Sequence, residues 1–280
     1  MGRVVQLVPM GDDGRELIDD YARYQRARGF STRTITRRTT TLRQFYALLI
    51  PGDFATASDR DVQDFLLRYR NPRTRHAYRS DIRSFYSWAF RRGLLPTDPT
   101  ILIDPVKVPK SLPRPVPAAM VPALVSMAPN PDLALMVALA AFAGLRAMEI
   151  AALSTDDVDL THNVLIVRNG KGRKDRIVPL HPVLRKLLEP ECKYAGQLFQ
   201  INAATVSRVV GRYLKAAGLH STAHSLRATF GTQLSEVSNG NIVMVQRLMG
   251  HESPTTTMAY VGWGGGEASG VVSTMYDDCA

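Results

Sequence analysis

The segment from His224 to Tyr260 reads HSLRATFGTQLSEVSNGNIVMVQRLMGHESPTTTMAY, and it decides the fold. Its apolar residues recur at helical spacing, which predicts one helix over residues 222–236 and a second over 241–249. Gly250 directly follows the second helix, and glycine is the residue type that commonly ends a helix at this position. We therefore expect this part of the chain to consist of short helices joined by tight turns.

The same segment carries polar side chains that are placed to act together. His224 and Arg227 are three residues apart on one helix face, so both can donate to one phosphate. Ser253 and Pro254 predict a further short helix, with serine as its N-cap and proline at its first position, and this helix carries Tyr260. Taken singly these features are common, because a lone tyrosine is usually a packing residue and an H-x-x-R pair says little.

The most apolar run of the chain lies upstream, from Leu133 to Ala143. Its 11 residues are too few to span a bilayer, so we predict a buried helix. Arg146 follows directly, and an arginine so close to a core helix needs an internal acid or an external anion as its partner. Glu149 is the internal candidate, so a structural ion pair and an anion-binding role are equally open.

Two apolar, β-branched runs, Asn163 to Arg168 and Arg176 to Leu180, flank the segment NGKGRKD and predict a β-hairpin. Lys171 stands at the hairpin tip between two glycines, which let the backbone approach a ligand while the lysine reaches outward. Many hairpin tips carry a lysine, so this feature alone is weak. Further helices are predicted near residues 183–189 and 203–217.

The first part of the chain differs in composition. Residues 14–93 show helical spacing throughout, whereas residues 94–117 contain seven prolines, which predict an extended linker. The chain has a net charge of +10, and residues 1–110 carry 20 Lys and Arg against 12 Asp and Glu. Such a basic protein usually binds a polyanion, with nucleic acid as the leading candidate.

Basic side chains on the helices, in the linker and in the hairpin are the candidate DNA contacts. These residues are Arg33, Arg37, Arg38, Arg75, Arg79, Lys107, Lys110 and Arg173. The alternative interpretation is a plain helical domain with solvated charges.

Two cysteines, Cys192 and Cys279, lie far apart in sequence, which predicts neither a disulfide framework nor a zinc cluster. This pattern fits a reducing cytosol. The N-terminal apolar stretch is too short for a signal peptide. We expect no metal, no cofactor and no membrane partner.

Together, the singled-out residues occur in an order that resembles the tyrosine recombinase (phage integrase) family. They are Arg146, Lys171, His224, Arg227, His251 and Tyr260. The resemblance rests on AGLRAMEIAAL, NGKGRKDRIVPL, HSLRATFGT, LMGHESPTTTMAY and the basic helical N-terminal region, and it covers about residues 14–262. One departure is Ala228, because the family often has a second histidine directly after the second arginine.

The resemblance implies a role for each residue. Tyr260 is the nucleophile, and it forms a 3′-phosphotyrosyl bond. Arg146 and Arg227 bind the non-bridging oxygens of the scissile phosphate. His224 assists proton transfer, and Lys171 protonates the leaving 5′ oxygen. His251 supports the site by hydrogen bonding. A covalent intermediate keeps the energy of the broken bond, so rejoining needs no ATP.

The resemblance also implies a mainly α fold with a small β-sheet. A helical-bundle core-type DNA-binding domain occupies residues 14–95, a basic proline-rich linker 96–117, an α+β catalytic domain 118–262, and a tail 263–280 that is exchanged between protomers. The tail has one apolar helix face, formed by Ala268, Val271, Val272 and Met275. Docking of this face on the chain's own catalytic domain is the alternative to exchange.

We expect a phage or mobile-element integrase that works in viral genome integration, in the cytoplasm of a bacterial host cell. Its partners are double-stranded attachment or core-type sites, three further copies in a tetramer that passes through a Holliday junction, and a directionality factor. Only about 13 residues precede the first helix, too few for an arm-binding domain. The alternatives are a Xer-type resolvase, a type IB topoisomerase-like enzyme and a catalytically silent DNA-binding protein.

Overall fold

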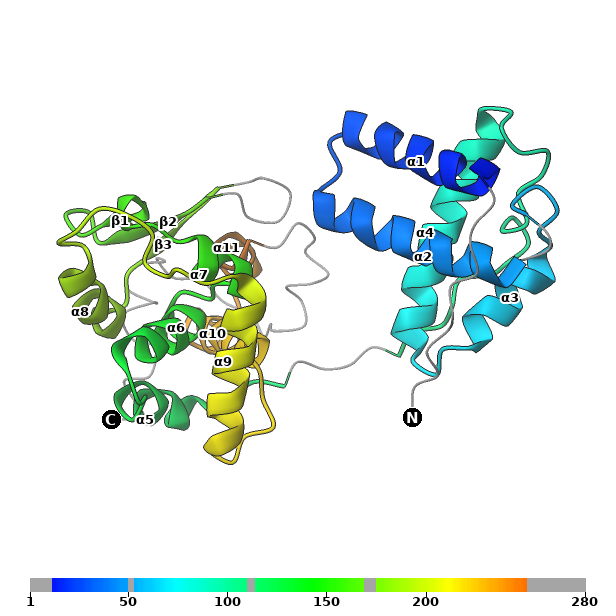
Figure 1. The fold of residues 1–280 in the computed structure, drawn as a ribbon. Coiled ribbons are helices and arrows are strands. Elements are labelled where there is room, and N and C mark those ends of the chain that lie inside the picture. Colours follow the sequence, from blue (N-terminus) through cyan, green and yellow to red (C-terminus); the bar gives the residue numbers. More distant parts are fainter. Residues whose placement is uncertain (1–11, 50–52, 110–113, 169–174, 251–280) are drawn as a thin grey trace. The chain divides into compact units, whose positions relative to one another are not determined.

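A computed structural model describes residues 12–49, 53–109, 114–168 and 175–250 of the chain (Figure 1). The chain divides into two compact units, Met1–Ser111 and Leu112–Ala280. Each unit has its own hydrophobic core. None of the helices within the described ranges is long and apolar enough to cross a bilayer.

The first unit is a bundle of helices, coloured blue to cyan in Figure 1. Polar residues fix where two of them begin. Ser58 caps one helix through reciprocal bonds with Asp61, and Asn71 caps the next one ahead of Pro72. The helices are α1 (Asp12–Ala27), α2 (Thr32–Leu49), α3 (Asp59–Leu67) and α4 (Pro72–Arg91).

Aromatic rings fill the core of this bundle. The ring centroids of Phe45 and Phe65 lie 5.4 Å apart and nearly perpendicular, and those of Phe54 and Phe85 lie 4.7 Å apart. Tyr21 joins the same core and donates to Ser84 Oγ at 2.7 Å. Such edge and tilted ring pairs add to the stabilisation from apolar burial, so these helices share one core.

The chain beyond α4 folds back onto it. Arg79 Nε donates to the carbonyl oxygen of Ile103 at 3.1 Å, and its Nη2 donates to the same oxygen. Arg83 Nη1 donates to the carbonyl oxygen of Thr100 at 3.1 Å. Thr100 and Ile103 are both buried. The chain therefore remains part of the first unit as far as residue 103.

The second unit is mostly helical and is coloured green to orange in Figure 1. Its chain is fastened at the start, because Val116 is buried and its carbonyl oxygen accepts a hydrogen bond from Thr229 Oγ1 at 2.8 Å. The helical elements are η1 (Ala118–Met120), α5 (Val121–Ser126), α6 (Pro131–Phe142), α7 (Ala147–Ala152), η2 (Thr155–Asp157), α8 (Pro182–Glu191), α9 (Ala203–Ala216), α10 (Ala223–Val237) and α11 (Ile242–Met249).

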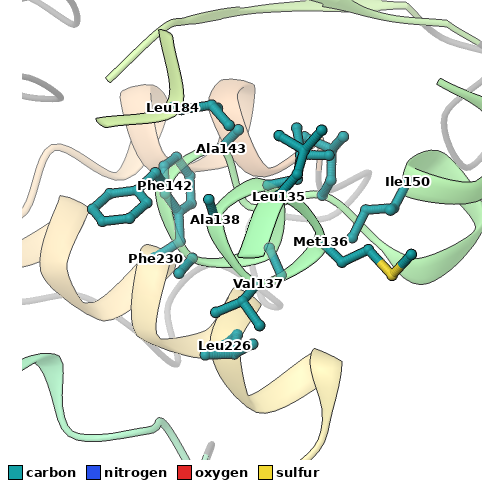
Figure 2. Close-up of a cluster of buried hydrophobic side chains, with 14 of the residues drawn as sticks. Leu135, Met136, Val137, Ala138, Phe142, Ala143, Ile150, Leu184, Leu226 and Phe230 are labelled. Carbon is teal, nitrogen blue, oxygen red and sulfur yellow. The ribbon is translucent and has the colours of Figure 1, made fainter. Parts of the chain in front are cut away.

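Helix α6 forms the centre of the second unit. Asn130 caps it ahead of Pro131, and every residue from Leu133 to Phe142 is buried. Figure 2 shows its side chains packed among apolar side chains of α7, α8 and α10, including Leu226 and Phe230. The predicted buried helix is thereby confirmed, and its uniform apolar composition follows from contact on all sides.

A small antiparallel sheet lies beside these helices. It contains β1 (Val158–Asp159), β2 (Val164–Val167) and β3 (Arg176–Pro179) in the order β1-β2-β3. Leu165 pairs with Val178, and both are fully buried, so one face of the hairpin packs on the core. The predicted paired strands and the mainly α fold are confirmed, as are the helices predicted near residues 183–189, 203–217, 222–236 and 241–249. The predicted helix that carries Tyr260 and the tail at 263–280 lie outside the described residues.

Candidate active site

Two arginines that are far apart in sequence converge on the end of α11. Arg146 precedes α7, and its Nη2 donates to the carbonyl oxygen of Gly250 at 3.0 Å. Arg227, on α10, donates through Nη1 to the carbonyl oxygen of Gly144 and through Nη2 to that of Met249. The side chain of Arg146 is 22% exposed and that of Arg227 is 1% exposed, so Arg146 is the one with access to solvent.

Two glycines allow this convergence. Gly144 has a φ of +61°, and an added Cβ would lie 2.4 Å from Cδ1 of Phe230. Gly250 ends α11 in the left-handed conformation with a φ of +60°, and an added Cβ would lie 3.0 Å from Nη1 of Arg176. Both positions therefore favour glycine for their positive φ, and at Gly144 the close approach of Phe230 also leaves no space for a Cβ.

Glu149 joins the arginines. Its Oε1 accepts from Arg146 Nη1 at 2.7 Å, its Oε2 accepts from the Arg146 backbone N–H at 2.8 Å, and Arg227 Nη1 lies 3.8 Å from Oε2. Burial raises the pKa of Glu149, but hydrogen bonds and charge from Arg176, with help from Arg146 and Arg227, outweigh it and lower this pKa to about 2. The carboxylate is therefore ionised at neutral pH.

Arg176 completes this group at the first residue of β3. Its Nη1 and Nη2 donate to Oε1 and Oε2 of Glu149 at 2.9 and 2.8 Å, and its Nε donates to the carbonyl oxygen of Leu248 at 2.9 Å. We call Arg146, Glu149, Arg176 and Arg227 the arginine cluster. Three positive charges face one negative charge in it, so the cluster favours binding of an anion.

His224 lies in the first turn of α10, where its side chain is exposed. Partial burial, followed by the positive charges of Arg227 and Arg146, lowers its pKa below the ordinary value of 6.5. The imidazole is therefore neutral at neutral pH and can accept a proton. His224 precedes Arg227 by three residues on α10, so the two side chains share one helix face and His224 lies beside the arginine cluster.

The structure thus brings three of the predicted site residues together, namely Arg146, His224 and Arg227. The other three, Lys171, His251 and Tyr260, lie outside the described residues. Ala228, at the position of the departure noted above, is a buried core residue.

From the sequence, Glu149 was expected to pair with Arg146 alone, and Arg176 was not predicted to belong to the site. The structure shows that Glu149 binds both residues at once. A weak signal for Arg176 exists, because an arginine that opens an otherwise apolar strand needs a buried or external anion.

The candidate DNA contacts differ in their exposure. Arg33 and Arg37 are exposed, although Arg37 Nη2 also lies 2.8 Å from Oδ1 of the buried Asp81. Lys107 is exposed as well, whereas Lys110 and Arg173 lie outside the described residues.

The remaining three are engaged within the unit. Arg38 is 15% exposed at its side chain, and its Nη1 donates to Gln25 at 2.9 Å. Arg75 is half-buried, and its Nη2 donates to the carbonyl oxygen of Arg70 at 3.5 Å. Arg79 is buried, and its Nε donates to the carbonyl oxygen of Ile103. Arg38 and Arg79 thus have acceptors inside the unit, and their expected DNA contact stays a prediction.

Within the described ranges, no group of three His, Cys, Asp or Glu side chains is placed to hold a metal ion. The arginine cluster itself offers donors rather than metal ligands. Its chemistry is anion binding, with a neutral histidine at its edge.

Comparison with known proteins gives a consistent result. The model of the phage integrase family matches residues 118–262. The chain is similar to the tyrosine recombinase XerA of Pyrococcus horikoshii, with 32% identity over 261 residues and 88% of each chain covered. It is also similar to the tyrosine recombinase XerD of Ralstonia nicotianae, with 31% identity over 229 residues, 72% of this chain and 74% of that one.

Solved structures share the fold at lower identity. A lambda integrase dimer bound to a COC′ core site matches with a TM-score of 0.72 and 19% identity, over 88% of this chain and 76% of that one. A lambda integrase tetramer bound to a Holliday junction matches with a TM-score of 0.73 and 18% identity, over the same shares of the two chains.

Proposed function

The chain belongs to the phage integrase family of tyrosine recombinases, enzymes that break and rejoin DNA, and from this premise we propose that it is a phage or mobile-element integrase with Tyr260 as its nucleophile. It acts on attachment or core-type sites in double-stranded DNA. It forms a tetramer on DNA, passes through a Holliday junction, works in the cytoplasm of a bacterial host cell and takes a directionality factor as a further partner.

One observation carries the assignment of the site. Arg146 and Arg227 both bind carbonyl oxygens at the end of α11, at Gly250 and Met249. The chain continues from there directly into His251 and then to Tyr260. Two anion-binding side chains are thereby anchored at the position from which the proposed nucleophile segment departs.

The proposed reaction needs no external energy source. The phenol of Tyr260 gives its proton to the neutral imidazole of His224 as its oxygen attacks the scissile phosphorus, the bond from phosphorus to the 5′ oxygen breaks, and Lys171 donates a proton to that oxygen. The phosphate stays on Tyr260 as a 3′-phosphotyrosyl ester. The 5′ hydroxyl of the partner strand then attacks this ester, which forms a new phosphodiester and releases Tyr260.

The arginine cluster supports this chemistry electrostatically. Negative charge grows on the non-bridging oxygens in the transition state, and preorganised cationic donors stabilise such charge strongly. In the proposal Arg146 and Arg227 bind those oxygens, His224 assists proton transfer, and His251 adds a hydrogen bond. The lowered pKa of His224 keeps the imidazole neutral and able to accept a proton.

We propose the division of labour expected from the sequence. Residues 14–95 bind core-type DNA, 96–117 link the units, 118–262 catalyse, and 263–280 form the exchanged tail. Within the first unit, the exposed Arg33 and Arg37 are the best supported phosphate contacts.

A Xer-type resolvase is the second candidate. It is favoured by the 32% identity to XerA of Pyrococcus horikoshii over 88% of both chains. A resolvase and an integrase use the same cleavage chemistry and differ in the sites that they join, so the distinction depends on the DNA.

A plasmid assay tests the function. The full-length protein is incubated with a supercoiled plasmid that carries the genomic DNA found on both sides of its coding sequence, and new junctions are sequenced. Joining of two different sites indicates an integrase, and resolution between two identical sites indicates a resolvase. Relaxation without new junctions would support a topoisomerase, and no change in the DNA would support a silent DNA-binding protein.

A second assay tests the nucleophile. A suicide duplex, nicked so that cleavage cannot reverse, is built on the identified junction. The wild type should form a covalent adduct, and Tyr260→Phe should bind the duplex with similar affinity and form none. An adduct from Tyr260→Phe would place the nucleophile elsewhere, with Tyr276 as the next candidate.

A further inference from the structure

We propose that Arg176 is a positioning residue for DNA cleavage, which holds the Glu149 carboxylate so that Arg146 and Arg227 stay available to the phosphate. The inference rests on the proposed function, because it concerns the step in which these two arginines bind the scissile phosphate. The side chain of Arg176 is 7% exposed, so it acts through its neighbours rather than by contact with DNA.

The first argument is geometric. The Arg176 guanidinium binds Glu149 on α7 through two parallel hydrogen bonds, and it binds the Leu248 carbonyl near the end of α11 through a third. A planar guanidinium has its donors in a fixed arrangement, so these bonds set both distance and orientation. Arg176 therefore links α7, which begins after Arg146, to the end of α11 at Gly250.

The second argument is competition for the carboxylate. Glu149 is buried and ionised, so it must be compensated by positive charge. Arg176 supplies this through the bidentate pair, while Arg227 remains 3.8 Å away. Without Arg176, the carboxylate would be compensated by Arg146 and Arg227 alone. The two groups proposed to bind phosphate would then be drawn toward an internal acid.

The third argument concerns the hairpin. Arg176 opens β3, five positions after Lys171 in the sequence. Its bond to Leu248 therefore fixes the base of the hairpin relative to the helix that leads into His251 and Tyr260. A general acid must lie within hydrogen-bond reach of the leaving oxygen, so the position of the hairpin base matters for the rate.

The test measures adduct formation on the suicide duplex and DNA affinity separately, with the full-length protein. Arg176→Gln should form the adduct about 10- to 100-fold more slowly, which is the range that a small misplacement of catalytic groups produces. Its DNA affinity should stay within about threefold, because Arg176 does not touch DNA in this proposal. Arg176→Lys restores the charge but not the planar fork, and should recover part of the rate.

Arg168→Gln is the matched control. Arg168 follows β2 on the same sheet, and its Nε donates to Oδ1 of Asp157 at 2.5 Å rather than to Glu149. Like Arg176→Gln, this variant replaces an arginine that forms an ion pair with a carboxylate. It should cleave at the wild-type rate.

A pH profile separates positioning from loss of folded protein. In Arg176→Gln the Glu149 carboxylate loses two donors, so its pKa rises from about 2 toward the assay range. The rate deficit should therefore shrink as the pH falls from about 8 to about 5, because the protonated carboxyl no longer draws Arg146 and Arg227 away from the phosphate. Thermal unfolding of each variant identifies the temperature at which all are folded.

The outcomes are distinct. A wild-type rate in Arg176→Gln, a deficit that is the same at every pH, or full recovery in Arg176→Lys would each overturn the inference, while the proposed function would stand. Absence of an adduct from the wild type would overturn the proposed function and this inference with it.

Discussion

Replacement of Glu149 by glutamine tests the arginine cluster most directly. Glutamine has nearly the same shape, so the variant removes the negative charge and leaves three guanidinium groups close together in a buried place. The pKa of this carboxyl falls from an ordinary 4.5 to about 2 in the folded protein. At about 1.4 kcal/mol per pH unit, the ionised form stabilises the fold by about 3 kcal/mol.

The sign of the pH dependence follows from the direction of the shift. Because the folded-state pKa is depressed, this stabilisation is fully present above about pH 4.5 and is lost as the pH falls toward about 2. We expect Glu149→Gln to be less stable than the wild type by about 3 kcal/mol at about pH 7. The difference should shrink steadily below about pH 4.5 and vanish near pH 2.

Urea unfolding of both proteins over this pH range is the assay, with the transition of the second unit followed separately from that of the first. The Asp157→Asn variant is a suitable control, because Asp157 forms an ion pair with the half-exposed Arg168 rather than with an arginine of the cluster. It should lose less stability than Glu149→Gln. Equal stability of Glu149→Gln and the wild type at neutral pH would refute the reasoning, as would a difference that does not depend on pH.

Three further predictions concern the fold, the general acid and the tail. Gly144→Ala should destabilise the second unit by about 2 kcal/mol or more, because alanine is strained at this φ and its Cβ would meet Phe230; urea unfolding measures this, and an unchanged midpoint would contradict it. Lys171→Ala should slow adduct formation on ordinary DNA far more than on DNA with a 5′-bridging phosphorothiolate, whose leaving group needs no proton; equal slowing on both substrates would remove the general-acid role. Deletion of residues 267–280 should leave binding to a single site intact in gel shifts but weaken synapsis and recombination, and full recombination by the truncated protein would show that the tail is dispensable.

Much of the fold could be predicted from the sequence, because its signals are local. The uniform apolar run from Leu133 predicts α6, and the capping residues Asn130 and Ser58 stand where helices begin. Strand β1 was not predicted, since two residues are too short to show an alternating pattern. Its pairing with β2 appears in three dimensions alone.

The site was predictable in part. Arg146, His224 and Arg227 could be found from motif order, but the bonds from Arg176 to Glu149 and Leu248 join a strand to two helices. No local spacing encodes such contacts, because they depend on how the elements pack.

Arg79 illustrates the opposite case. Its position in a row of arginines on α4 indicated an outward, DNA-facing side chain. The same spacing also suits a face that is covered by a returning segment, and Thr100 to Ile103 provide that cover. Exposure of a helix face therefore could not be inferred from charge pattern alone.

The two anchored ends of the connecting chain limit how far the units can separate. Ile103 is fastened to α4, and Val116 is fastened to α10. About 13 peptide steps join them, which reach at most ~45 Å when fully extended. In the proposed division of labour, a tether this short keeps the second unit at an effective concentration in the millimolar range once the first has bound DNA. If both units can engage one site together, the avidity of the intact chain exceeds the affinity of either unit by about 10² to 10⁴ without any additional contact. Proteolysis between the two anchors would abolish that gain while leaving each unit folded around its own core.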